Sequence, residues 1–168
     1  MKEILEAIKQ RLLAKVDSLK YIDEDWGQLD YYSPNIPTKW PACLLDIDNV
    51  PWSGEGDLIQ MGIAQVSVKI SSMRLSNSNV KAPDNQRTAS ASILDTMSDV
   101  HAALHGWHDT ESMNGPLTRI VTRRIKRDDG IREYEMIYAV QITDDSAMPE
   151  TLQYPMTRQK IKVVVNKL

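Results

Sequence analysis

Three histidines lie close together in the stretch HAALHGWH, at positions 101 to 108. His101 and His105 are four residues apart, a spacing that places two side chains on one face of a helix. His108 follows, and two carboxylates come within the next three residues. Imidazole nitrogens and carboxylate oxygens are ligands that zinc prefers. This stretch is therefore the first candidate for metal chemistry in the chain.

A simpler interpretation of the histidines competes with the metal site. His101 continues an apolar helical stripe, His108 lies beyond the expected end of the helix, and no glutamate stands between the first pair as in HExxH hydrolases. A tetrahedral site needs three or four convergent ligands, and histidine in a last helical turn is favoured by the helix dipole. We expect no metal and no cofactor, and a metal-binding enzyme that uses His101, His105 and His108 remains the alternative.

Other motifs of catalysis or ion binding are incomplete. The stretch DIDNVPWSGEGD contains acidic residues, but an EF-hand loop that starts at Asp46 needs glycine where this chain has Pro51. Gly54 and Gly56 lack the third glycine and the helix of a phosphate-binding loop. Cys43 stands alone in an apolar run, which predicts a buried small hydrophobe without a disulfide. The sequence predicts a protein that is not an enzyme.

A basic stretch, RIVTRRIKR at positions 119 to 127, has Arg132 on the expected partner strand. Such residues can contact a phosphate backbone, but the net charge of −3 gives the molecule no long-range attraction for nucleic acid. Acidic residues next to the stretch offer cross-strand partners. A solvated face is the favoured interpretation, and a protein interface or a nucleic-acid contact stays open.

Composition limits the class of protein. With 168 residues, of which 42% are hydrophobic and 26% charged, the chain fits one globular domain over residues 1–168. The N-terminal stretch lacks the pattern of a signal peptide, and no apolar run approaches the roughly 20 residues that cross a bilayer. We expect a soluble protein with no membrane partner.

Hydrophobic periodicity predicts two helices. One has apolar residues from Ile4 to Leu19 and is expected to end between Ser18 and Lys20. The other is expected to begin after an N-cap at Asp84, behind a polar loop, and to end at Gly106, a natural residue after a helix end.

Strand patterns fill the rest of the chain. Residues 42–47 predict a central strand covered on both faces, and 48–57 a hairpin loop. Residues 58–72 alternate between a core face and a wet face, and a change of phase beside Gly62 predicts a β-bulge. Further strands are expected at 117–126 and 131–143, joined by a turn at Asp129 and Gly130, and at 161–165. The order predicts an α+β fold, a single domain with a mainly antiparallel, mixed β-sheet packed with two main α-helices.

Three tryptophans, Trp26, Trp40 and Trp52, lie in or beside proline-rich loops. Because the chain has no phenylalanine, core packing is the favoured role for them, with interface anchoring second.

Several segments together resemble a known family. The N-terminal amphipathic helix, PACLLDID after a proline-rich loop, GIAQVSVKIS, a helix that ends in ALHGW, and EYEMIYAVQITDD resemble the small tail terminator or tail completion proteins of long-tailed phages, which prophages often encode. The resemblance covers most of the chain.

The resemblance implies a structural subunit. It would form a homo-oligomeric ring, expected to be a hexamer, that caps the tail tube, with the tail tube protein and the head-tail connector protein as partners and no sequence-specific nucleic acid. It would be made in the cytoplasm of the bacterial host and end in the virion tail. A connector protein of the neck is the alternative. The candidate interface residues are Trp52, Glu55, Asp57, Arg123, Arg124, Arg127 and Arg132.

Overall fold

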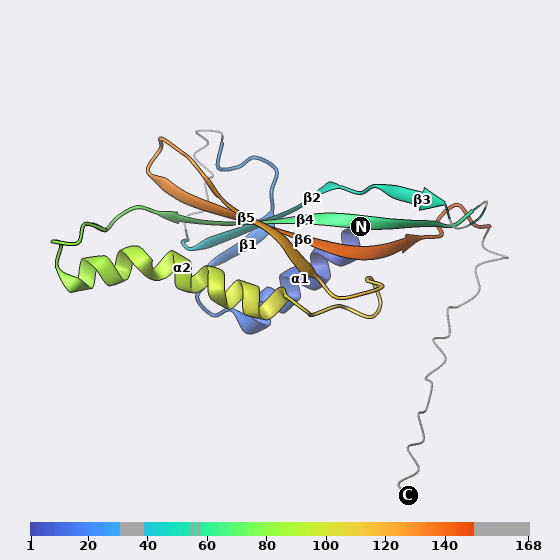
Figure 1. The fold of residues 1–168 in the computed structure, drawn as a ribbon, viewed down its shortest axis with the longest axis horizontal. Helices are drawn as coiled ribbons and strands as arrows, with labels where there is room; N and C mark the ends of the chain where they lie inside the picture. Colours follow the sequence, from blue (N-terminus) through green and yellow to red (C-terminus); the bar gives the residue numbers. More distant parts are fainter. Residues whose placement is uncertain (31–38, 55, 57, 150–168) are drawn as a thin grey trace, which may run out of the picture.

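The computed structural model describes residues 1–30, 39–54, 56 and 58–149. They form a six-stranded mixed sheet with two helices on one of its faces (Figure 1). The elements are α1 (Lys2–Lys15), β1 (Tyr21–Glu24), β2 (Ala42–Asn49), β3 (Trp52–Gly54), β4 (Gln60–Met73), α2 (Asp84–Leu104), β5 (Thr118–Ile125) and β6 (Ile131–Asp144). The strand order is β1-β2-β4-β6-β5, with β3 paired to β4. Only β1 and β2 pair in parallel among these strands, so the predicted α+β class is confirmed.

The two longest strands form the axis of the molecule. β4 and β6 pair without a break from Gln60 opposite Asp144 to Met73 opposite Ile131. At roughly 3.3 Å per residue, strands of this length span about 45 Å. Among the described strands, β5 is the edge on one side of the sheet and the short β1 is the edge on the other.

The helices cover one face of the sheet and build the main core. α1 buries Ile4, Ile8 and Leu12, and α2 buries residues such as Ile93 and Val100, as amphipathic helices must. The sheet contributes alternate residues of its central strands, which include Val66, Val68, Ile70, Met136, Tyr138, Val140 and Ile142. The predicted core faces of both long strands are confirmed.

The opposite face of β4 and β6 is only partly wet, contrary to the prediction. Ser67, Ser71, Glu133 and Glu135 are all buried there. The cause is the segment Asp25–Asp30, which we call the covering segment. It follows β1 and passes over this face (Figure 1), and its own Gln28 and Leu29 are buried. The residue pattern within β4 or β6 could not predict this burial, because the segment that causes it comes from a distant part of the chain.

Both helices differ from their predicted bounds by a few residues. α1 ends at Lys15, although Val16 and Leu19 beyond it still join the core. Asp84 is the first residue of α2 and not its N-cap, which is Pro83, and its carboxylate instead pairs with Arg87 one turn on.

The prediction of a β-bulge beside Gly62 is wrong, because the β4–β6 register is continuous past Gly62. Register shifts lie instead in β2, between Ile47 and Asn49, and in β5, between Arg119 and Val121. The expected loop at 48–57 is shorter than predicted, because β2 runs to Asn49 and Trp52–Gly54 forms β3. β2 is covered on both faces at residues 42–45, but the central strand of the sheet is β4.

The turn predictions are confirmed. Gly130, in the β5–β6 turn, has φ of 79°, and Gly106, just after α2, has the same value. Glycine adopts this conformation at no steric cost. Within the described residues, no helix has the length and apolar character needed to span a membrane. The expected strand at 161–165 and the candidates Glu55 and Asp57 lie outside the described residues.

Candidate functional site

The histidine cluster contains a pair rather than a triad. The ring centroids of His101 and His105 are 4.9 Å apart at the end of α2. His101 Nδ1 lies 3.3 Å from the hydroxyl of Tyr138 on β6, and the backbone N–H of Arg119 on β5 donates to His105 Nδ1 at 3.2 Å. Partial burial, with help from the Arg119 guanidinium, lowers the pKa of His101. The pair therefore ties the end of α2 to the sheet.

His108 lies beyond the helix and is exposed. Across the part of the chain that the structure describes, no three or more histidine, cysteine, aspartate or glutamate side chains are grouped so as to hold a metal ion. The free Cys43 is fully buried on β2, as expected, and burial raises the pKa of its thiol to about 12. A thiol in this state is a poor nucleophile, because the thiolate is the reactive form.

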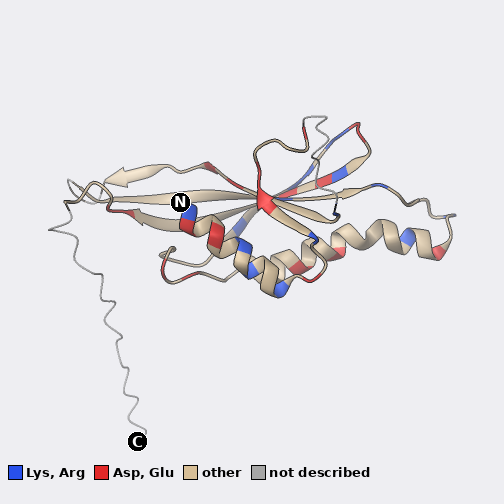
Figure 2. Cartoon of the chain, turned by 180° about the vertical axis from the view of Figure 1, so that it is seen from behind, with Lys and Arg blue, Asp and Glu red and all other residues tan. Residues whose placement is uncertain are grey.

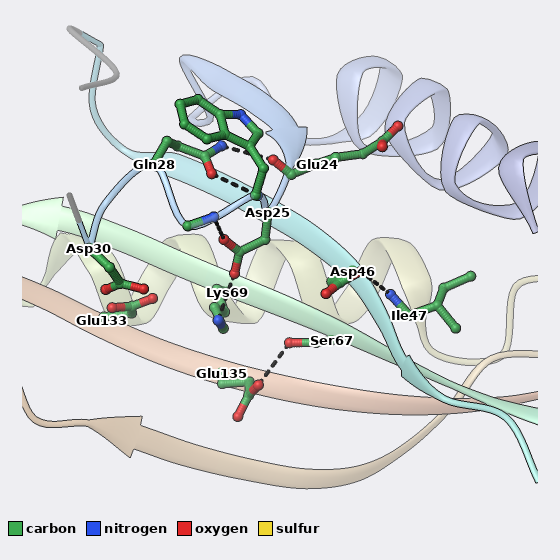
Figure 3. A network of polar contacts seen from close by, with 12 residues as sticks. Glu24, Asp25, Gln28, Asp30, Asp46, Ile47, Ser67, Lys69, Glu133 and Glu135 are labelled. Atoms are coloured by element: carbon green, nitrogen blue, oxygen red, sulfur yellow. Dashed lines mark hydrogen bonds and ion pairs between the residues drawn. The ribbon is translucent and has the colours of Figure 1, made fainter. Parts of the chain in front are cut away.

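A polar cluster lies on the sheet face opposite the helices (Figure 3). Lys69 on β4 stands in the cross-strand row that also includes Glu135 on β6. Lys69 Nζ is 2.6 Å from Asp25 Oδ2 in the covering segment, and the hydroxyl of Ser67 donates to Glu135 Oε1 at 2.7 Å. Arg123 of β5 pairs with the other oxygen of Glu135. The cluster therefore connects the covering segment to three strands.

Arg127 binds the far end of the covering segment. Its guanidinium donates to Asp30 Oδ1 at 2.7 Å, to Glu133 Oε2 at 2.9 Å, to both oxygens of Asp129, and to the backbone carbonyl of Leu29. The hydrogen bond to Asp129, then those to Asp30 and Glu133, raise the pKa of Arg127. The side chain is only 12% exposed, so this interface candidate is committed to an internal contact.

Burial affects the carboxylates of this face in a graded way. Desolvation raises the pKa of Glu133 even though Arg127 acts in the opposite direction. Desolvation, followed by repulsion from Glu135 and Asp46, raises the pKa of Asp48. Asp48 is exposed, whereas Glu133 is buried and paired with Arg127, so that losing Arg127 would leave the charge of Glu133 uncompensated. We interpret the contacts of Lys69 with Asp25 and of Arg127 with Leu29 and Asp30 as those that hold the segment after β1 against the sheet, and we call them the clasp.

The other predicted interface residues occupy different surroundings. Arg132 donates to the backbone carbonyl of Ser90 in α2, and its guanidinium lies 5.8 Å from the ring centre of Tyr134. Arg124 is exposed, and among the described residues it has no carboxylate partner. The roles of these residues in an interface stay predictions.

The tryptophans do not all serve the core. Trp26 is 58% exposed and Trp52 is 39% exposed, so the core interpretation is wrong for them, whereas Trp40 is half-buried. Trp52 lies on the helix side of the sheet, where its indole passes over Gly62. Its exposed part lines a surface cavity of about 450 Å³.

That cavity was not predicted from the sequence. It lies where α1 begins and β6 ends, and its lining includes Ile4 and Ile142 beside three carboxylates, those of Glu3, Glu111 and Asp144. The N-terminal ammonium of Met1, which also lines it, is 3.3 Å from Glu3 Oε2. The three acids come from the first turn of α1, the loop after α2 and the last residue of β6. We call it the acidic cavity. Its residues are too far apart in the sequence to form a motif.

The comparisons with known proteins give a fold and no family. No protein-family model and no curated protein matches the chain. Among solved structures, a chain from the "Virion of native gene transfer agent (GTA) particle" is similar to it with a TM-score of 0.56 and 11% identity, covering 84% of this chain and 95% of that chain. The described sheet and its two helices thus form a fold that a component of that virion also has.

Proposed function

We propose that this protein is a phage or prophage structural subunit that caps the tail tube as a ring and mediates head-tail joining. The observation that carries the proposal is the fold shared with a chain of a phage-like virion, which covers nearly all of that chain. The sequence resemblance to tail terminator proteins, noted on different grounds, points in the same direction. The activity would reside in surfaces and not in a catalytic cleft.

The molecule has properties that suit a ring subunit. A long, continuous pair of central strands makes a rigid body, and the clasp fixes the segment after β1 to it. Exposed apolar side chains occur on the loop before α2 and on the edge strand β5, at Leu75, Val80 and Ile120. Repeated heterologous contacts between such bodies form a ring when the rotation between neighbours closes on itself.

Deletion of the gene tests the position in the particle. A ring that caps a tube blocks further addition of tube subunits, so particles without it should have tubes of uncontrolled length and heads that carry no tail. Electron microscopy of particles induced from the deleted and the restored strain measures both features. Tubes of normal length and complete, joined particles in the deleted strain would refute the proposal.

The same experiment separates the alternative, a connector protein of the neck. Loss of a neck protein should leave tubes of normal length beside filled heads, because only the joint is missing. Co-sedimentation with purified tail tube protein or with connector protein then identifies the direct partner. A tail cap must bind the tube protein, whereas a neck protein need not.

Two other classes predict different solution behaviour. A metal-dependent enzyme would take up stoichiometric zinc when purified without a histidine tag, and a nucleic-acid-binding module would bind duplex DNA at about 50 mM salt and lose that affinity steeply as salt rises. Either result would favour the other class over the structural subunit.

A further inference from the structure

Two opposite ends of the sheet have opposite charge. The acidic cavity lies where β6 ends, at Asp144, which is opposite the start of β4. The other end, about 45 Å away along the same strands, lies where β4 ends beside the β5–β6 turn. In Figure 2 these ends lie on opposite sides of the molecule, with the N-terminus on the acidic side.

The second end carries unpaired cations. The backbone N–H of Arg74 donates to the carbonyl of Gly130 at 2.9 Å, which places the end of β4 against the hairpin turn. Arg74, Arg124 and Lys126 are exposed there, and no carboxylate pairs with any of them among the described residues. We call this the basic end.

Exposed apolar side chains accompany both charges. Met73 is 47% exposed and Leu75 is 84% exposed at the basic end, and the acidic cavity presents the partly exposed indole of Trp52. Each end therefore combines apolar surface with an excess of one sign of charge, which resembles a protein interface more than a solvated tip. The opposite sign is present in smaller amount, as the N-terminal ammonium of Met1 beside Glu3 in the cavity and as the exposed Asp128 in the turn of the basic end.

The distribution of charge selects the geometry of contact. Contact between two copies through the same end is disfavoured, because the charges in excess there have the same sign and would face each other. The acidic cavity of one copy and the basic end of another are complementary. A contact between different patches of identical chains is heterologous, and its repetition gives a ring or a filament.

We propose that the acidic cavity, with Glu3, Glu111 and Asp144, receives the basic end of a second copy of this chain, with Arg74, Arg124 and Lys126. The inference rests on the proposed function, because it supplies the contact from which a ring would be made. Screening by salt should weaken the contact, since the charges on both sides are exposed.

Charge reversal in the full-length chain tests the contact. One variant changes the basic end, by Arg124→Glu with Lys126→Glu, and is called the tip variant. The other changes the acidic cavity, by Glu3→Lys with Glu111→Lys, and is called the cavity variant. Each variant alone should need at least tenfold more protein to associate than the wild type does, measured by sedimentation velocity and native mass spectrometry at about 50 mM salt. An equimolar mixture of the two variants should associate again. The unchanged basic end of the cavity variant then meets the unchanged acidic cavity of the tip variant, and the reversed end of the tip variant meets the reversed cavity of the cavity variant.

Matched controls carry the same change of charge elsewhere. Asp95→Lys with Asp99→Lys lies on the exposed face of α2, and Lys15→Glu with Lys20→Glu lies at and after the end of α1. Both should associate like the wild type. Restoration by mixing also shows that the variants are folded, because an unfolded chain cannot offer a complementary end.

Several outcomes would overturn the inference. They are a wild type that stays monomeric at low salt and high concentration, variants that associate normally, or a mixture that does not recover. A normal tip variant beside an impaired cavity variant would point to another cationic occupant, such as residues 150–168, which include four basic residues and one acidic residue. If the protein is present in virions but both charge-reversal variants assemble normally, the proposed function stands and this contact is wrong. If the protein associates by its ends but is absent from virions, the contact stands and the proposed function is wrong.

Discussion

The indole of Trp52 lies across Gly62, the residue opposite it on β4, so closely that a Cβ at Gly62 would stand 2.7 Å from Cε3. The side chain of Val50 approaches the same point to 2.8 Å. Gly62 has an ordinary strand conformation, so its importance is one of space and not of backbone freedom. This contact sets the position of the indole at the wall of the acidic cavity.

Gly62→Ala should destabilise the protein by about 1–3 kcal/mol, the usual range for added volume in a packed site. Urea unfolding measures the change. Gly54→Ala is the matched control, because a Cβ there has its nearest neighbour only at 4.0 Å. Combining Gly62→Ala with Trp52→Ala should recover part of the loss, and equal effects at Gly54 and Gly62 would contradict the steric explanation.

Arg127→Met should cost about 3 kcal/mol, because it leaves Glu133, whose side chain is 4% exposed, buried without its cationic partner. The segment from Asp25 to Asp30 should also be cleaved faster by protease, since two of its anchors bind Arg127. Arg124→Met, on the exposed edge strand, is the control and should change the free energy of unfolding by less than about 0.5 kcal/mol. A clasp without importance would give the same small value for both.

Asp129 should contribute a pH-dependent part of the stability. The hydrogen bond from Arg127 lowers its pKa below the ordinary value of 3.8. A carboxyl with a lowered folded pKa stabilises the folded state above its unfolded pKa, and this contribution is lost as pH falls through the folded pKa. The difference in unfolding free energy between wild type and Asp129→Asn should therefore be constant above about pH 5 and shrink below the ordinary value, as thermal unfolding across that range would show. A difference that stays constant down to pH 2 would refute the assignment.

His105→Ala should remove one hydrogen-bond acceptor and no metal site. The N–H of Arg119 then loses its imidazole partner, and the expected cost is about 0.5–1.5 kcal/mol. Calorimetric titration with zinc should give the same result for the variant and the wild type. Stoichiometric zinc binding that disappears in the variant would instead revive the alternative of a metal enzyme.

The sequence predicted the elements that are built from local patterns. The hairpin around Gly130 and the core face of β6 follow from turn chemistry and from alternation, and both are confirmed. The errors come from contacts across elements. The predicted change of phase at Gly62 is wrong, because the alternation continues there and Ile63 is exposed, and the register shifts among the described strands lie in β2 and β5.

The candidate sites were harder to predict for the same reason. Glu133 and Glu135 alternate with core residues and so predict a wet face, but the segment after β1 buries them. Arg127 and Arg124 are similar in the sequence, yet one is enclosed by carboxylates and the other is exposed. A local pattern shows which way a side chain points within its strand, and only the tertiary fold decides whether anything covers it.

Because β4 and β6 pair without interruption, the distance between the two ends of the sheet can change only in discrete steps. Side chains alternate between faces, so a change in strand length preserves every inside and outside position only when residues are added or removed in pairs. Each such step alters the distance between the two ends by about 7 Å. In a ring of subunits joined head to tail, the circumference would therefore change in fixed increments. The number of residue pairs between β4 and β6 would set the diameter of the ring.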